Sequence, residues 1–399
     1  MKRIILIVTV MCTVCTAMFA AIGVDMQAHM GTKEAQEAYN TYINKQSTYY
    51  TGTYSYSNLS ALSGNDLFGA LNTLMGNTSR IGNSSFSYNS LRDQYKNVDK
   101  DLNRSGYIIG YYNGASFSGV WDSGKTWNRE HTWPQSKGAD KSIPMGHDMQ
   151  SVRPTHTSVN SSRGNDAYGE SGSYYDPDEV SINNSYYVSS NLGSYRGDAA
   201  RVILYDYIVY GKAGGHQNSL YNTNAQLLDK LGTSGVFQSI PVLLKWHMND
   251  PISLTEMVRN DGAQNYQGNR NPFIDYPELA IQMLKDVSGV NTYTVTTQGT
   301  TMWPNYTLTL NSGFIAYLGK PNARPTQVTV TGATHTYDST TGRLIIKSVI
   351  GAVSITTTTT AMENIQTTAD SYKTIYNGQV VIIRDGKIYN MMGLEIATY

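Results

Sequence analysis

Both cysteines of this 399-residue chain, Cys12 and Cys15, lie in the apolar stretch at its N-terminus. A basic start and the almost wholly apolar run of residues 4–21 are the pattern of a secretory signal peptide. We therefore expect residues 1–23 to be removed on export, with the stretch ending at Ala28 as an alternative cleavage site. The remaining chain would contain no cysteine, so its fold must be stabilised by packing without disulfides. Thiolate metal ligands and a cysteine nucleophile are excluded as well.

A single transmembrane anchor is the alternative interpretation of the N-terminal segment. The apolar run is short for a bilayer and no basic stop signal follows it. Neither cysteine follows the small-residue run of a lipoprotein site. We expect a secreted protein, extracellular or at the cell surface, with no stable membrane span.

The composition favours an extracellular protein rich in loops and strands, because Gly (36) and Tyr (31) are abundant and only 15% of residues are charged. Lys+Arg and Asp+Glu both number 30, so the formal net charge is zero. A strong nucleic-acid binder usually carries a basic face. Any affinity for a polyanion must therefore come from a local cluster of cations.

The length predicts two or three folded units. Residues 24–48 are a polar lead-in, helical in part, and residues 49–289 mix helical and strand patterns. From residue 290 to 362 the chain alternates with a period of two, which predicts a β-sandwich-like module. Residues 363–399 predict a terminal hairpin pair. The expected fold class is α+β, with a mixed α/β domain followed by a small all-β module.

Several elements of the mixed domain can be placed from periodicity. Leu67–Met75 has apolar residues at helical spacing, residues 107–112 are typical of a strand, and residues 198–210 predict a buried helix. Asp275, Pro277 and Glu278 have the spacing of a capped helix start. We therefore expect a helix to begin at Asp275.

The richest polar pattern lies in residues 128–134 (NREHTWP) and 158–165 (SVNSSRGN). Residues 127–133 are predicted to be a strand that pairs with residues 148–153, and the second run a short helix. On a strand Glu130 and His131 point to opposite faces, so they can serve one site only if the strand bends or twists near Pro134. On the helix, Asn160 and Arg163 share a face with His156.

These residue types fit the hydrolysis of a phosphodiester with one metal ion. A hard divalent cation such as Mg²⁺ prefers oxygen ligands and keeps several waters, so Glu130 and Asn160 are enough to hold it. His131 suits a general base because its ordinary pKa lies near neutrality. Each signal also has an ordinary structural explanation when it is taken alone: a helix end entering a turn, a surface Glu–His pair, core tryptophans. Together, in a secreted chain, they favour catalysis.

The ordered motifs resemble the bacterial endonuclease I family of ββα-metal (His-Me finger) nucleases. The resemblance spans roughly residues 49–287 and is carried by residues 129–134, 148–154, 159–165, 196–201 and 267–275. It implies metal-dependent, sequence-nonspecific endonucleolytic cleavage of DNA, and often of RNA, that leaves 5′-phosphates. This chain lacks the disulfides of some family members.

The resemblance also implies roles for individual residues. By position, Glu130 and Asn160 match the metal ligands and His131 the general base. Arg163 matches a residue expected near the phosphate. Arg153 and Arg270 are candidates for substrate contact, although Arg270 equally fits a salt bridge to Asp275. Structural roles are expected for His147, His156, Trp246 and His247. The expected cofactor is Mg²⁺, with Mn²⁺ or Ca²⁺ as alternatives.

Two other functions remain open at this stage. One is a secreted metallohydrolase of another substrate class, and the other is a surface adhesin or glycan-binding protein whose binding lies in the module after residue 290. The tail from Tyr376 to Tyr399 resembles the sorting domains of type IX export in Bacteroidetes, which would make the export machinery a partner. An ordinary terminal hairpin is equally consistent with it. We expect a monomer whose substrate is DNA and, as a second substrate, RNA.

Overall fold

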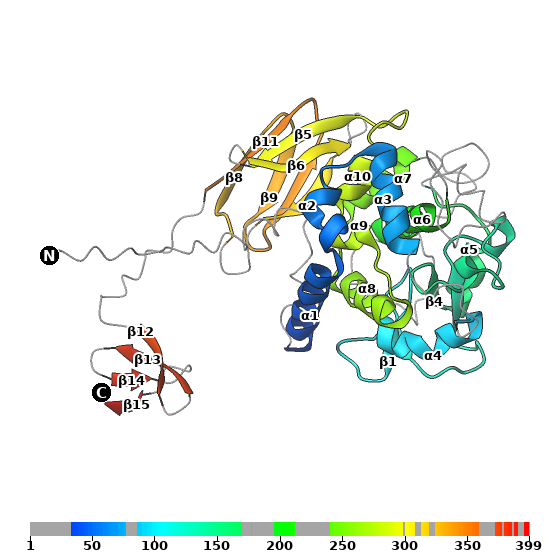
Figure 1. Ribbon diagram of the computed structural model, residues 1–399, viewed down its shortest axis with the longest axis horizontal. Coiled ribbons are helices and arrows are strands. Elements are labelled where there is room, and N and C mark those ends of the chain that lie inside the picture. Colours follow the sequence, from blue (N-terminus) through cyan, green and yellow to red (C-terminus); the bar gives the residue numbers. More distant parts are fainter. Residues whose placement is uncertain are drawn as a thin grey trace.

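A helical region that carries a two-stranded ribbon is followed by a β module and a terminal sheet (Figure 1). In Figure 1 the ribbon and its helix α5 lie on the side of the helical region away from the β module. The computed structural model describes residues 33–76, 86–169, 177, 195–211, 240–297, 300–307, 313–318 and 324–358, and four strands between residues 372 and 398. The signal-peptide prediction lies outside these residues.

The helical region is built mainly from α-helices that bury one or more faces. They are α1 (Lys33–Tyr49), α2 (Tyr56–Leu59), α3 (Gly64–Gly76), α4 (Tyr88–Val98), α5 (Thr157–Arg163), α6 (Arg196–Tyr210), α7 (Ile240–Asn249), α8 (Leu254–Gln267), α9 (Pro272–Asp275) and α10 (Glu278–Leu284). Three short 3-10 turns are η2 (Gly52–Tyr54), η3 (Gln135–Lys137) and η4 (Pro144–His147).

Local sequence accounts for where several helices begin. Ser87 caps α4, and Ser253 forms a capping box with Glu256 at the start of α8, so the first backbone N–H groups of both helices find acceptors. The helix predicted at residues 198–210 is present as α6, which is buried around most of its circumference and lies against α3 and α7.

The helix predicted after Asp275 is present as α10, but Asp275 is not its cap. A short helix, α9, precedes it; α9 begins at Pro272, is capped by Asn271, whose side chain accepts a hydrogen bond from the Phe273 N–H at 3.0 Å, and ends at Asp275. The next helix, α10, begins at Glu278 after Pro277. The Asp275 carboxylate cannot act as a cap because it is held by the guanidinium of Arg270 at 2.8 Å.

The strand predicted around residues 127–133 is β3 (Trp127–His131), and it pairs antiparallel with β4 (Val152–His156). The partner strand predicted at residues 148–153 therefore lies closer to the N-terminus than β4, the strand that pairs with β3. The reason is Asp148, whose carboxylate accepts from the backbone N–H of Gln150 and from the Tyr205 and Tyr210 hydroxyls, so residues 148–151 form a turn before the strand begins.

Two further strands, β1 (Tyr107–Ile109) and β2 (Ser116–Ser118), pair antiparallel beside α4. The strand predicted at residues 107–112 is thus shorter than expected. It ends before Tyr111 and Tyr112, and Tyr112 has a left-handed φ of 72°. That conformation turns the Tyr112 side chain toward the β3–β4 ribbon.

The β-strand pattern predicted after residue 290 is present as a module of two sheets. Its first sheet has the order β6-β5-β11-β8, and its second the order β7-β10-β9. The bounds are β5 (Thr292–Thr297), β6 (Thr300–Thr307), β7 (Phe314–Tyr317), β8 (Gln327–Thr331), β9 (Thr334–Asp338), β10 (Arg343–Lys347) and β11 (Val353–Thr358). Helix α10 lies against β6 and α7 against β7, and one hydrophobic cluster joins the module to the helices.

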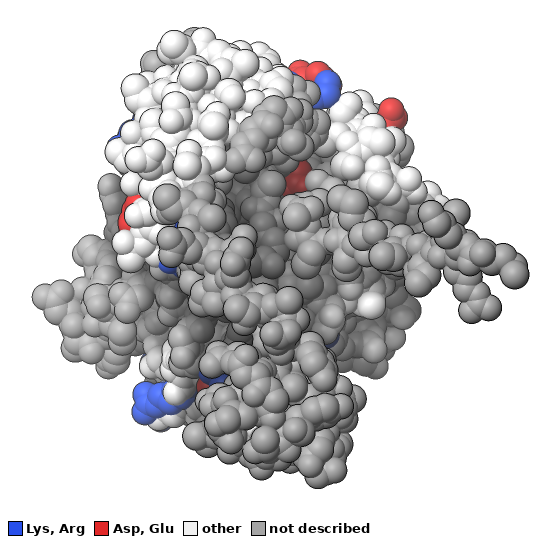
Figure 2. All heavy atoms as spheres, turned by 90° about the vertical axis from the view of Figure 1, so that its left-hand side faces the viewer, with Lys and Arg blue, Asp and Glu red and all other residues white. Residues whose placement is uncertain are grey.

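The last sheet is antiparallel and consists of β12 (Tyr372–Tyr376), β13 (Gln379–Arg384), β14 (Lys387–Tyr389) and β15 (Glu395–Thr398). No helix within the described ranges is long and apolar enough to cross a membrane. On the face shown in Figure 2, the charged side chains of the described residues are scattered and both signs occur, without a broad basic patch.

Candidate active site

Glu130 is the buried carboxylate of the β3–β4 ribbon, with a relative exposure of 1%. The Tyr112 hydroxyl donates to its Oε1 at 2.7 Å, and Arg163 Nη1 lies 3.3 Å from the same oxygen. Burial raises the pKa of Glu130, while Arg163 and then the Tyr112 hydrogen bond act to lower it. Oε2 accepts no hydrogen bond from the residues that the structure describes, so this oxygen is available to a ligand.

Asn160 is brought to the same strand by α5. Its amide nitrogen donates to Asn128 Oδ1 at 2.5 Å and reaches the Arg129 carbonyl oxygen at 3.4 Å. The side chain is half-buried, and within the described part of the chain nothing donates to its amide oxygen. The hydrogen bonds fix which end of the amide faces β3 and leave Oδ1 as an acceptor.

The donor set of Glu130 and Asn160 fits a hard divalent cation. Each contributes an oxygen to which no described residue donates, and Mg²⁺ or Ca²⁺ takes carboxylate and amide oxygens together with water. The described residues contain no group of three or more His, Cys, Asp or Glu side chains placed to hold a metal ion. A site built here would therefore depend on this pair and on solvent.

His131 is the last residue of β3 and is 7% exposed. Its Nε2 lies 3.0 Å from the Gly146 carbonyl oxygen in η4. A carbonyl can only accept, so Nε2 carries the proton and Nδ1 keeps its lone pair. The Gln135 amide nitrogen lies 3.3 Å from Nδ1, and the Tyr88 ring stacks on the imidazole at 5.2 Å between centroids.

Burial lowers the pKa of His131 to about 4. The Gly146 carbonyl acts in the opposite direction, and the charges of Arg129 and Arg163 lower the pKa further. The imidazole is therefore neutral at neutral pH, which is the form that can accept a proton.

Glu130 and His131 leave the ribbon on different sides, as their neighbouring positions on a strand require. Glu130 contacts Tyr112 and Arg163, whereas His131 contacts Gly146 and Gln135. No hydrogen bond joins the two side chains. They are linked through the backbone and through Arg163.

Arg163 is 1% exposed and its contacts are to protein groups. Besides Glu130, it donates to the carbonyl oxygens of His131 at 3.1 Å and of Thr132 at 2.7 Å. The structure thus joins Arg163 to Glu130 and to the backbone of His131, while Asn160 contacts the same strand at Asn128 and Arg129. It places the Arg163 guanidinium beneath the end of β3 rather than at the surface.

Arg153 and Arg270 lie in different surroundings. Arg153 is the Cα partner of Glu130 across the ribbon, so the two residues share a face. Its guanidinium lies 4.8 Å from the Tyr111 ring centroid, and its Nε has no hydrogen-bond partner among the described residues. Arg270 belongs to a separate cluster, in which it pairs with Asp275 and with Asp261 at 2.7 Å. The salt bridge to Asp275 expected from the sequence is therefore present.

The histidines and tryptophan expected to be structural have the following places. His156 caps α5 through its Nδ1, so it precedes the helix rather than sharing a helical face with Asn160. His247 Nε2 lies 2.8 Å from the Pro277 carbonyl oxygen in the core, where Trp246 is also buried. His147 lies at the end of η4 and contacts the Lys141 carbonyl oxygen.

Sequence analysis did not identify Tyr112, Gly146, Gln135 or Tyr88 as parts of the site. Tyr112 lies 18 residues from Glu130, and Gly146 lies 15 residues from His131. Neither residue belongs to a recognisable local motif. Gln135, only four residues after His131, is the one that inspection of the sequence around the motif could have suggested.

Comparison with known proteins places this ribbon and helix in a class of nucleases. Residues 63–278 match the family model of Endonuclease I. An extracellular ribonuclease of Bacillus amyloliquefaciens is 32% identical over 239 residues, which cover 58% of this chain and 77% of that protein. An extracellular ribonuclease of Bacillus subtilis (strain 168) is 32% identical over 208 residues, 50% of this chain and 69% of that protein.

The chain belongs to the Endonuclease I family. It is therefore an enzyme, a nuclease that hydrolyses phosphodiester bonds, as the motifs predicted.

Proposed function

We propose that this protein is a secreted, metal-dependent endonuclease that cleaves RNA and DNA with little sequence preference and uses His131 as the general base. The observation that carries this proposal is the hydrogen bond from His131 Nε2 to the Gly146 carbonyl oxygen at 3.0 Å. It fixes the tautomer in which Nδ1 can accept a proton from water.

The surroundings of His131 support this role. Its pKa of about 4 keeps the ring neutral at the pH at which an extracellular enzyme works. The Tyr88 ring and the Gln135 amide restrict the orientation of the imidazole. A positioned base of this kind contributes roughly 100- to 10,000-fold to a hydrolysis.

Glu130 and Asn160 are the proposed metal ligands, through the oxygens that lack a protein donor. Mg²⁺ bound there, or Mn²⁺ or Ca²⁺ in its place, would neutralise the charge of the phosphate and stabilise the leaving oxygen. Arg163 favours the ionised form of Glu130 and so keeps it fit to bind a cation. Its contacts suggest that its effect on the phosphate is exerted through Glu130 and the end of β3.

Arg153 is the better-placed cation for a phosphate oxygen. It shares the Glu130 face of the ribbon, and among the described residues no carboxylate pairs with it. The ion pairs of Arg270 within its own cluster make it a weaker candidate for substrate contact.

RNA is proposed as a substrate because both relatives are named ribonucleases, and DNA because the chain belongs to the Endonuclease I family. Low sequence preference is consistent with recognition of the phosphate backbone, which carries no sequence information. The products are proposed to carry 5′-phosphates.

The test is digestion of supercoiled plasmid DNA and of structured RNA with added Mg²⁺, and again with EDTA. The wild-type enzyme should nick both, EDTA should stop it, and His131→Ala should lose at least about 100-fold in rate. His335→Ala, on β9 of the β module, is the matched control and should keep the full rate. Cleavage by His131→Ala at the wild-type rate would refute the assignment of the base.

Export is a separate part of the proposal. Both relatives carry the word extracellular in their names, and the terminal sheet β12–β15 is proposed as the signal read by the export machinery. A zymogram of culture supernatant and of washed cells, with and without residues 363–399, tests this. Retention of an active, shortened enzyme inside the cell is expected, whereas unchanged release would contradict the sorting role.

A further inference from the structure

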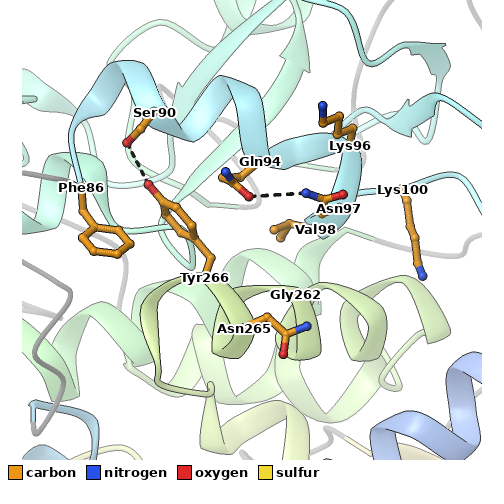
Figure 3. Close-up of a pocket in the computed structure, with 10 residues that line it drawn as sticks. All are labelled: Phe86, Ser90, Gln94, Lys96, Asn97, Val98, Lys100, Gly262, Asn265 and Tyr266. Atoms are coloured by element: carbon orange, nitrogen blue, oxygen red, sulfur yellow. Dashed lines mark hydrogen bonds between the residues drawn. The ribbon is translucent and has the colours of Figure 1, made fainter.

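A groove runs between α4 and α8, outside the residues assigned above. It encloses a pocket of about 680 Å³, within the size range of ligand-binding pockets. Its walls carry several amides, two aromatic side chains (Phe86 and Tyr266) and two lysines (Lys96 and Lys100). Figure 3 shows α4 along one wall and α8 along the other.

The close approach of the two helices explains the groove. A Cβ atom at Gly262 would lie 2.7 Å from Val98 Cα, so only glycine lets the helices touch at this point. Longer side chains on either side then form walls above the contact. The floor is therefore rigid backbone, and the walls can contact a ligand.

The two ends of the groove differ in chemistry. At one end the Phe86 and Tyr266 rings meet edge to face at 4.8 Å, and the Tyr266 hydroxyl is hydrogen-bonded to Ser90 at 2.8 Å (Figure 3). At the other end Lys96 and Lys100 are exposed. No Asp or Glu lines this pocket. Aromatic faces followed by cations are the features with which proteins bind single-stranded nucleic acid.

A second pocket, of about 440 Å³, continues the groove toward α1 and shares Lys100 with it. Glu34, Glu37, Asp101 and Asp261 line this second pocket. Four carboxylates repel a polyanion, so a nucleic-acid strand in the groove would end near Lys100.

The aromatic end of the groove and the active site lie at the same end of α4, on different sides of that helix. Phe86 and Ser90 stand two residues before and after Tyr88, whose ring stacks on His131. Lys96 lies eight positions after Tyr88 on α4, which is about 12 Å along the helix at about 1.5 Å per residue.

We propose that the α4–α8 groove binds an unpaired stretch of the RNA or DNA substrate next to the phosphate that is cleaved. Phe86 and Tyr266 stack on a base, and Lys96 and Lys100 contact the following phosphates. This inference rests on the proposed nuclease function. It predicts that substrates long enough to fill the groove are cleaved more efficiently than very short ones.

The first test is Lys96→Gln combined with Lys100→Gln, measured on a single strand of about twelve nucleotides, long enough for a stacking groove, and on a trinucleotide. KM for the longer strand should rise about 10-fold with kcat unchanged, while the trinucleotide should be cleaved as before. Arg343→Gln combined with Lys347→Gln is the matched control, since it removes the same charge from two exposed positions of β10. Equal losses on both substrates, or no loss, would overturn the proposal.

The second test measures binding without cleavage. In EDTA, fluorescence anisotropy of the same labelled strand over a range of salt concentrations should show the slope of log K against log salt falling by about 1.4 in the lysine variant, about 0.7 for each lost phosphate contact. Phe86→Leu should weaken binding about 10-fold and leave the slope unchanged. An unchanged slope in the lysine variant would overturn the proposal that the groove binds nucleic acid.

The two tests also separate this inference from the proposed function. If the protein binds the strand through the groove but never cleaves it, only the proposed nuclease function is refuted. If the protein cleaves both nucleic acids and the substitutions at Lys96 and Lys100 have no effect, only the proposed role of the groove is refuted.

Discussion

Arg163 reaches back from the end of α5 so that its Nη1 lies 3.3 Å from Oε1 of Glu130, and both side chains are almost fully buried. The same guanidinium donates to the carbonyl oxygens of His131 and Thr132. One cation therefore holds the proposed metal-binding carboxylate and the end of the strand that carries the proposed base. A buried ion pair of this kind is costly to break, because its partner is left charged away from water.

Arg163→Met should lower the free energy of unfolding by about 3–5 kcal/mol at pH 7. The loss should be smaller at pH 5. Burial already raises the pKa of Glu130, and removing Arg163 raises it further. A carboxyl whose folded pKa is raised favours folding at low pH, and this contribution is lost as the pH rises through the folded pKa. Urea unfolding at the two pH values measures the difference.

The control for this variant is Arg92→Met. Arg92 pairs with the exposed Asp93 at 3.8 Å, and such surface pairs contribute roughly 0–1 kcal/mol. Equal losses at pH 7 and pH 5 for Arg163→Met would contradict the assigned role of Glu130.

Gly146→Ala should lower kcat about 10- to 100-fold, the size seen when the partner that orients a site residue is lost. A Cβ atom at Gly146 would lie 2.0 Å from the Asp140 carbonyl oxygen. The turn must therefore move, and with it the carbonyl that orients His131. Gly351→Ala is the control, since nothing lies within 4 Å of the added atom. A Gly146→Ala enzyme with full kcat would show that the tautomer is fixed by something else.

Sequence analysis predicted the parts of the site that lie within one short run of the chain. Strand β3 and helix α5 lie where residues 127–133 and 158–165 predicted them, because each prediction rests on one continuous run of residues. The register of β4 could not be predicted, since it depends on Asp148 being held by Tyr205 and Tyr210. Distant contacts of this kind leave no periodic trace in the sequence.

The same limit explains the error at Asp275. Its spacing to Pro277 and Glu278 is that of a helix cap, whereas Arg270 equally fitted a salt bridge to it. The fold decides between the two, because the Arg270 guanidinium holds the Asp275 carboxylate. The role of Tyr112 was likewise hidden, because its left-handed backbone points it at Glu130. Composition was a poor guide too, since a chain of zero net charge belongs to a family of nucleases.

His247→Gln should make stability less sensitive to acid. His247 is fully buried, and burial, followed by the charge of Arg201, lowers its pKa to about 3. As the pH falls from about 6.5, the unfolded chain gains a proton at this position before the folded chain does. Stability is then lost at up to about 1.4 kcal/mol per pH unit until the folded pKa is reached.

Glutamine can still donate to the Pro277 carbonyl oxygen but does not titrate. The slope of unfolding free energy against pH, measured between about pH 6 and pH 4, should fall by up to one proton relative to wild type. Buried carboxyls with raised pKa values, such as Asp206, act with the opposite sign but are common to both chains. An unchanged slope in His247→Gln would mean that this histidine is not buried in solution.

Ile355→Ala tests whether the β module is part of the nuclease or a separate attachment. Ile355 is fully buried on β11, in the hydrophobic cluster that also contains Leu279 and Leu284 of α10. Deleting its side chain should therefore cost about 2–5 kcal/mol, and nuclease activity should be lost at the same, lowered temperature as the β-sheet signal. Thr356→Ala, one residue along and exposed, should change neither. Two separate transitions, with activity surviving the first, would instead support the expectation that the module only delivers or anchors the enzyme.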